Sequence, residues 1–110
     1  MENKRAFPRF DSTFQVRYSP EGGNMPRGYT ISNDISRGGL RMPSSSGILA
    51  KGDIVNLEME SADSTRYIPA VGKVRWLKAI DRNAPLDEEV GIEFIDIRSV
   101  DIDNLLKKHR

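Results

Sequence analysis

The sequence predicts a mostly β domain that ends in one α-helix. Several short segments alternate apolar and polar residues, and turns rich in glycine and proline separate them. In the last 12 residues, SVDIDNLLKKHR, the apolar period changes to that of a helix. Short strands separated in this way are typical of a small closed barrel or a sandwich. With 110 residues, the chain fits one domain with one modest core.

Six segments have the alternation of a half-buried strand. They are residues 14–19, 29–36, 39–43, 53–60, 66–77 and 88–97. The apolar side of these segments, which we expect to face the core, contains Phe14, Val16, Tyr18, Met42, Val55, Leu57, Met59, Ile68, Ala70, Gly72, Val74, Trp76, Val90, Ile92 and Phe94. The turn between the second and third segments is centred on Arg37, Gly38 and Gly39. The pattern predicts that Trp76 belongs to the core and does not stack on a ligand.

Residues 99–109 are expected to form the helix. Ser99 is expected as its N-cap. Acidic residues near the start and basic residues near the end match the helix dipole. The apolar stripe, spaced at i, i+3 and i+4, consists of Ile102, Leu105 and Leu106.

The charge of the chain is nearly balanced, with 17 basic and 16 acidic residues. We therefore do not expect bulk attraction to nucleic acid or to an anionic membrane to be its main function. The chain has no cysteine, and hence neither a disulfide nor a thiolate ligand. No run approaches the roughly 18 apolar residues that cross a bilayer, and the N-terminus lacks the apolar segment of a signal peptide. We expect a cytoplasmic protein that does not insert into a membrane.

The sequence lacks the residues of ordinary catalytic and metal sites. Its one histidine, His109, is the penultimate residue, where chain ends fray. It cannot anchor a catalytic triad or a metal site there. Glu88 and Glu89 belong to a charged run typical of a solvated loop, and there is no glycine-rich phosphate loop with its lysine. These absences predict no catalytic residue, no metal and no cofactor, and therefore a protein that is not an enzyme.

The segment KRAFPRF places Arg5 and Arg9 four residues apart, with Pro8 between them. Pro8 disfavours a helix in this segment. In an extended chain, residues four apart point the same way at a separation of about 13 Å. A guanidinium can bind phosphate, or the O6/N7 edge of guanine, with two hydrogen bonds. Taken alone, two arginines in a terminal arm are more simply solvated charges.

The segment NDISRGGL, residues 33–40, contains Asp34 and Ser36 two residues apart, so both share one face of a strand. An aspartate accepts hydrogen bonds from the N1–H and amino groups of guanine, and a serine hydroxyl or a bare backbone N–H can bind phosphate. Gly38 and Gly39 permit a turn with positive φ, or a close approach of the backbone to a ligand. Taken alone, this segment also fits an ordinary capped turn in a β-hairpin.

Together, the two motifs resemble the PilZ domain family, bacterial receptors for cyclic di-GMP. The family pattern is R-x-x-x-R in an N-terminal arm, followed by [D/N]-x-S-x-x-G on a strand and turn. VGKVRW and VGIEF also resemble the closing strands of the family. The resemblance implies a six-stranded antiparallel β-barrel with a C-terminal helix in residues 13–110, after a flexible arm in residues 1–12. The five residues that match the two motifs are Arg5, Arg9, Asp34, Ser36 and Gly39.

The resemblance also implies what these five residues bind. Arg5 and Arg9 would hold phosphate and the O6/N7 edges of the guanines. Asp34 would read the polar edge of a guanine, and Ser36 would support phosphate or base. Gly39 would leave room for the ligand. The arm would be flexible when free and ordered over the ligand when bound, and the chain would then signal in trans to a protein partner.

Three further residues are candidate ligand contacts. Lys4 precedes the arginine motif, at a position that the family likeness links to the number of ligand molecules, and we favour a self-intercalated pair over a single molecule. Arg37 lies inside the second motif, where a ligand contact and simple exposure to solvent are equally good interpretations. Gly38 would offer its backbone.

Two other functions stay open from the sequence. The first is a PilZ-like domain that binds a protein and no nucleotide, although such a domain would not need the five motif side chains. The second is a small barrel that binds single-stranded nucleic acid, which requires aromatic platforms beside a basic groove. The aromatic content of 7% and the balanced charge argue against the second function.

Overall fold

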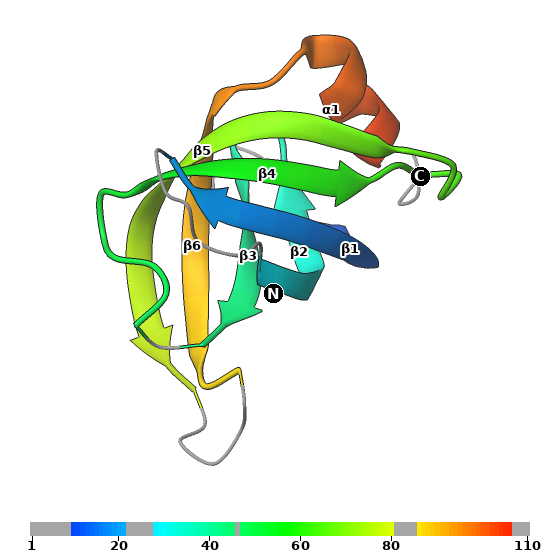
Figure 1. Cartoon of the computed structure of the whole chain (residues 1–110). Helices are drawn as coiled ribbons and strands as arrows, with labels where there is room; N and C mark the ends of the chain where they lie inside the picture. Colours follow the sequence, from blue (N-terminus) through cyan, green and yellow to red (C-terminus); the bar gives the residue numbers. More distant parts are fainter. Residues whose placement is uncertain (1–9, 22–27, 46, 81–85, 107–110) are drawn as a thin grey trace, which may run out of the picture.

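The computed structural model describes residues 10–21, 28–45, 47–80 and 86–106. Within these ranges the chain forms six β-strands and one α-helix (Figure 1). The elements are β1 (Phe10–Pro20), β2 (Gly28–Ser36), β3 (Gly39–Ser44), β4 (Ile54–Glu60), β5 (Tyr67–Ala79), β6 (Glu88–Asp96) and α1 (Ser99–Leu106). Most of the expected arm lies outside the described residues, and its last three residues begin β1. The last three residues of the expected helix also lie outside them.

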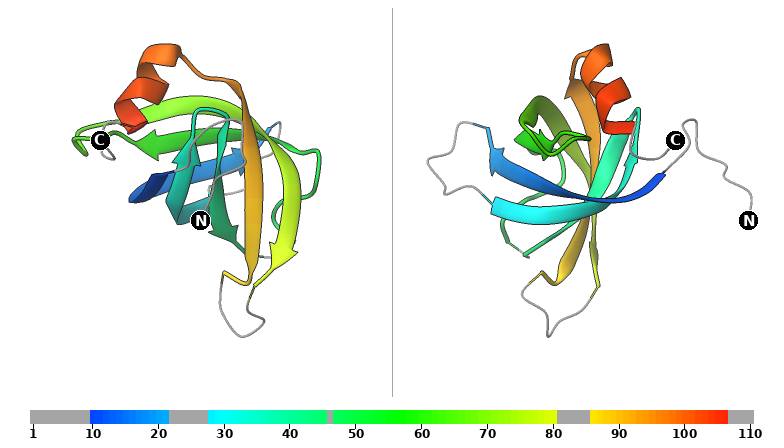
Figure 2. Two further views of the ribbon diagram at one scale, coloured as in Figure 1. Left: turned by 180° about the vertical axis from the view of Figure 1, so that it is seen from behind. Right: turned by 90° about the vertical axis from the view of Figure 1, so that its right-hand side faces the viewer.

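The six strands form one closed barrel in the order β1-β2-β3-β6-β5-β4. All neighbouring strands are antiparallel, and the pairing of β1 with β4 closes the barrel. The helix α1 lies at one end, opposite the end where β5 finishes and β6 begins (Figure 2). The prediction of a mostly β fold with one C-terminal helix is confirmed, and the architecture is a barrel rather than a sandwich.

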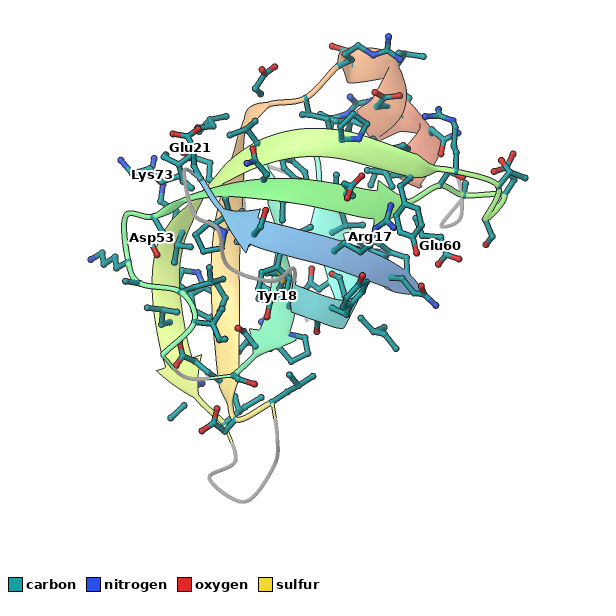
Figure 3. The ribbon with its side chains drawn as sticks, viewed as in Figure 1. Arg17, Tyr18, Glu21, Asp53, Glu60 and Lys73 are labelled. Atoms are coloured by element: carbon teal, nitrogen blue, oxygen red, sulfur yellow. The ribbon has the colours of Figure 1, made fainter. Side chains whose placement is uncertain are left out.

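The core fills the barrel, and most of the side chains expected to face inward are buried. They are Phe14, Val16, Tyr18, Met42, Val55, Leu57, Met59, Ile68, Ala70, Val74, Val90 and Ile92. Tyr18 forms a hydrogen bond of 3.1 Å between its hydroxyl and Ser44 Oγ, whereas Arg17 leaves the opposite face of β1 (Figure 3). From α1, Leu105 and Leu106 are buried against the same core.

Trp76 is not part of this core, so the prediction that it belongs to the core is wrong. Val74 and Trp76 pair with consecutive residues of β6, which makes Arg75 the extra residue of a β-bulge. Because side chains alternate across a strand, one extra residue exchanges its two faces. Leu77 therefore packs against the core, and Trp76 is half-buried with its indole over Gly91.

The helix begins at Ser99, the residue that was expected to be its N-cap. The N–H groups of Asp101 and Ile102 donate to the carbonyl oxygen of Arg98 at 3.0 and 3.1 Å. Arg98 is therefore the N-cap, and Ser99 is the first helical residue. In the described part of the chain, no helix is long and apolar enough to cross a membrane.

Candidate functional site

The hairpin of β2 and β3 positions the second motif. Asp34 pairs with Arg41, and Ser36 pairs with Gly39, across a turn formed by residues 37–38. The pairing is regular over this stretch, so Asp34 and Ser36 lie on the same face of β2. This shared face is what the spacing of the two residues predicts.

Asp34 is a buried carboxylate that an arginine holds. Its side chain is 5% exposed, and Arg41 Nε donates to Asp34 Oδ2 at 2.7 Å. The NH2 group of Arg41 donates to the same oxygen. On its other side, Arg41 NH1 lies 3.7 Å from Oε1 of Glu89 on β6. Arg41 thus links three strands and compensates for the burial of the Asp34 charge.

The hydroxyl of Ser32 joins the backbones of Asp34 and Arg41. It is fully buried and donates to the carbonyl oxygen of Arg41 at 2.7 Å. It also accepts the N–H of Asp34 at 3.4 Å. The regular pairing of β2 with β3 ends at Asp34 and Arg41. The Ser32 side chain therefore extends the contact between the two strands by one step.

The turn is held by Ser36 and by β6. Ser36 Oγ accepts the N–H of Gly38 at 3.2 Å, and the carbonyl oxygen of Gly38 accepts the N–H of Phe94 at 2.9 Å. A Cβ atom on Gly39 would lie 1.9 Å from the carbonyl oxygen of Ile92, and Gly39 has no positive φ. The glycine is thus required by a close approach of two strands, not by a left-handed turn.

Arg37 connects the turn to the C-terminal helix. Its NH2 group donates to Oδ1 of Asp103 on α1 in an ion pair. The two side chains are 43% and 48% exposed, so solvent screens the pair and its contribution to stability is small. The Arg37 side chain is therefore exposed, as one interpretation of the sequence had it, but it also has a partner.

A hollow of about 220 Å³ lies beside the turn. Its lining includes Ser36 at the end of β2, Gly38 from the turn, and Arg75 and Trp76 from β5. A Cβ atom on Gly91 would lie 2.2 Å from the indole Nε1, so a glycine there lets the indole lie directly against β6. The bulge in β5 therefore presents an aromatic ring and a guanidinium next to the motif.

A larger hollow, of about 610 Å³, lies away from the motif, between β4, β5 and residues 96–98. The side chain of Asp101 at its edge is 3% exposed. Arg98 Nε donates to Asp101 Oδ2 at 3.1 Å, and Arg66 NH2 donates to Oδ1 at 3.5 Å. The hydrogen bonds from Arg98 chiefly hold the pKa of Asp101 below its ordinary value, against the effect of burial. This cluster fastens the start of α1 to the barrel.

The structure gathers the second motif at one turn and does not describe the first. The predicted site residues that it brings together are Asp34, Ser36, Arg37, Gly38 and Gly39. Lys4, Arg5 and Arg9 lie outside the described residues. Phe10, where β1 begins, pairs with Ile35 in the middle of the motif. Among the described residues, no group of three or more His, Cys, Asp or Glu is placed to hold a metal ion.

Three residues of this region were not found from the sequence: Ser32, Arg41 and Asp103. The sequence could have indicated Arg41. A turn of two residues, 37–38, places Arg41 opposite Asp34, whereas the expected turn, centred on residues 37–39, does not. No comparable signal links Arg37 to Asp103, since 66 residues separate them.

Comparison with known proteins supplies a family for this barrel. The family model of the PilZ domain matches residues 3–108. A search of curated proteins finds no match.

Several solved structures have the same fold. The inhibitor of motility MotI/DgrA from Bacillus subtilis superposes with a TM-score of 0.76 at 22% identity, over 96% of this chain and 49% of that one. The PilZ domain of YcgR from Escherichia coli, solved with c-di-GMP, gives 0.71 at 10% identity, over 97% and 89%. The K. pneumonia MrkH–c-di-GMP complex gives 0.68 at 16% identity, over 97% and 51%. The chain spans about half the length of MotI/DgrA and of MrkH.

Proposed function

The chain belongs to the PilZ domain family, and we propose that it is a receptor for cyclic di-GMP that signals in trans to a protein partner. PilZ domains are receptors without catalytic activity. Two of the solved structures with this fold, the PilZ domain of YcgR and MrkH, contain the same ligand. The proposal for this chain depends on whether its own residues can form such a site.

The observation that carries the proposal is the pairing of Phe10 with Ile35. Arg9 is joined to Phe10 by one peptide bond, so their Cα atoms are about 3.8 Å apart. Arg5 lies within about 18 Å of Phe10, the reach of a fully extended chain. Since Ile35 stands between Asp34 and Ser36, the connectivity supports a single site built from both motifs.

The chemistry of each group supports its assignment in this site. Arg5 and Arg9 would bind phosphate and the O6/N7 edges of guanine with paired hydrogen bonds. Asp34, held by Arg41, would accept the N1–H and amino groups of a guanine. Ser36 would turn its hydroxyl toward phosphate or base.

Trp76 is an addition to the site expected from the sequence. Its indole is half-buried and lines the same hollow as Ser36 and Gly38. A base stacked on an aromatic side chain contributes about 1–3 kcal/mol to binding. Gly39 was expected to leave room for the ligand, and we assign it a different role. It lets β3 approach β6 closely enough for the backbone to form the wall of the hollow. Lys4, Arg37 and Gly38 remain candidate contacts.

In the proposed mechanism, the ligand orders the arm over the barrel. Pro8 would reduce the entropy lost on ordering, because it already restricts the free chain. The ordered arm and the ligand would form a new surface for a protein partner. The proposal includes a cytoplasmic location and requires no nucleic acid and no insertion into a membrane.

Isothermal titration of cyclic di-GMP into the chain tests the proposal. We expect saturable binding with two ligand molecules per chain; one molecule would reject the pair favoured from Lys4. For each site, ligand at a hundredfold excess over Kd should raise the free energy of unfolding by about 2.7 kcal/mol, whereas GMP should not raise it. Arg9→Ala should abolish most of this gain without destabilising the free chain. No binding at high ligand concentration would overturn the proposal and favour a PilZ-like domain that binds only protein.

A further inference from the structure

We propose that Arg41 is a positioning residue that sets the guanine selectivity of the site by fixing Asp34. This inference rests on the proposed function, and it names the residue on which recognition of the base depends. Arg41 belongs to neither motif and was not found from the sequence. Its contacts, rather than its place in a pattern, lead to this assignment.

The ion pair with Arg41 restrains the Asp34 carboxylate. Nε and NH2 of one planar guanidinium both donate to Asp34 Oδ2, the first at 2.7 Å. The last torsion of an aspartate is otherwise broad, so an unrestrained carboxylate samples many orientations. Once Oδ2 is held from β3, the plane of the carboxylate is set relative to the sheet. A carboxylate held in one orientation can accept a hydrogen bond from a base in one direction only.

Burial also favours a cation beside Asp34. The Asp34 side chain is 5% exposed, and a buried carboxylate is costly unless a cation and hydrogen bonds accompany it. Without Arg41, we expect Asp34 to turn from this position toward solvent, where it would no longer meet the N–H donors of guanine in a fixed orientation.

Arg41 is itself restrained. Its carbonyl oxygen accepts the buried Ser32 hydroxyl at 2.7 Å, and its NH1 group lies 3.7 Å from Glu89 Oε1. The guanidinium therefore lies between two carboxylates, of Asp34 and Glu89. Leaving both of them for a ligand phosphate would remove from the buried Asp34 carboxylate the cation that donates two hydrogen bonds to it. We conclude that Arg41 acts through Asp34 and not by touching the ligand.

The chain offers a matched control in Arg17. Arg17 also forms an ion pair across two strands, with NH2 3.4 Å from Glu58 Oε2, between β1 and β4. Its side chain is 26% exposed, compared with 34% for Arg41. Arg17 leaves β1 on the face opposite the buried Tyr18 (Figure 3), and its ion pair with Glu58 is separate from the one between Arg41 and Asp34.

The test compares cyclic di-GMP with its inosine analogue, which lacks the exocyclic amino group, by titration calorimetry. The ratio of the two affinities measures how well Asp34 reads guanine. We expect Arg41→Gln and Asp34→Asn to lower this ratio by about tenfold to a hundredfold. The double variant Asp34→Asn/Arg41→Gln should equal Asp34→Asn alone, and Arg17→Gln should keep the original ratio. Arg41→Lys, which retains a cation, should give an intermediate ratio and serves as the test if Arg41→Gln does not fold.

The outcomes separate the two proposals. If Arg41→Gln binds both ligands more weakly by the same factor, or if the losses of the double variant add in full, Arg41 does not act through Asp34 and the inference is wrong. If Arg41→Gln does not fold, the inference is likewise wrong if Arg41→Lys has the same ratio of affinities as the unsubstituted chain. If the unsubstituted chain binds neither ligand, the proposed function fails, and this inference fails with it.

Discussion

A Cβ atom on Gly39 would lie 1.9 Å from the carbonyl oxygen of Ile92, an oxygen of the strand that pairs with β3. The glycine that completes the second motif is therefore needed for β3 and β6 to pair, before any ligand is considered. A backbone oxygen in a sheet cannot turn aside as a flexible side chain can. Substitutions of Gly39 will consequently affect folding as well as any ligand site.

We expect Gly39→Ala to lower the free energy of unfolding of the free chain by about 1–3 kcal/mol, because β3 and β6 must separate to admit the methyl group. Urea unfolding measures this loss. Gly91→Ala is the control, since the atoms that a Cβ would meet there belong to the half-buried side chain of Trp76, which can move. A larger loss for Gly91→Ala than for Gly39→Ala would contradict the prediction.

Trp76 should affect ligand binding more than stability. It is the one tryptophan of the chain, so fluorescence reports on the hollow directly. Trp76→Ala should weaken cyclic di-GMP binding roughly five- to a hundredfold. It should destabilise the chain by less than the about 3–5 kcal/mol typical of a buried aromatic residue. Leu77→Ala, on the core side of the same strand, should show the reverse: a larger loss of stability with nearly unchanged affinity.

The ion pair between Arg37 and Asp103 should compete with any ligand contact of Arg37. We expect Asp103→Asn to raise the affinity for cyclic di-GMP by about 1.4- to fivefold, since an exposed pair contributes about 0.2–1 kcal/mol that the ligand would otherwise have to replace. In an Arg37→Gln background the same substitution should have no effect. If Asp103→Asn leaves calorimetric affinity unchanged in the original chain, Arg37 is not a ligand contact.

Asp101 should make stability sensitive to acid. Its pKa in the folded chain is below the ordinary value of 3.8, chiefly through the hydrogen bonds from Arg98. The ionised form is thus favoured by folding, so its contribution is complete above about pH 4 and is lost as the pH falls through the lower folded value. Thermal unfolding between about pH 2 and pH 7 measures this loss.

Asp101→Asn should lower the free energy of unfolding at neutral pH by about 1 kcal/mol, because both arginine partners are at least half exposed and solvent screens them. It should also reduce the loss of stability below about pH 4. Asp103→Asn, on the same helix, is the control and should retain that loss, because its ion pair with Arg37 is about half exposed. An acid profile that Asp101→Asn leaves unchanged would contradict the assignment.

Alternation along single strands was sufficient to predict the strands, most of their inward side chains and the mostly β fold. Phe14, Val16 and Tyr18 are buried as expected, because the side-chain period of a strand is a local property of the backbone. The spacing of Asp34 and Ser36 predicted their common face for the same reason. The resemblance of the two motifs supplied the family, which the match over residues 3–108 confirms.

Only the tertiary structure decided what depends on the register between strands. The bulge at Arg75 turns Trp76 out of the core. The close pairing of β3 with β6 requires a glycine at position 39. The β2–β3 hairpin places Arg41 within hydrogen-bond distance of Asp34. Each of these features is a relation between residues on different strands. A strand's own sequence fixes which side chains alternate but not which residue of a neighbouring strand lies opposite, and one extra residue exchanges the two faces.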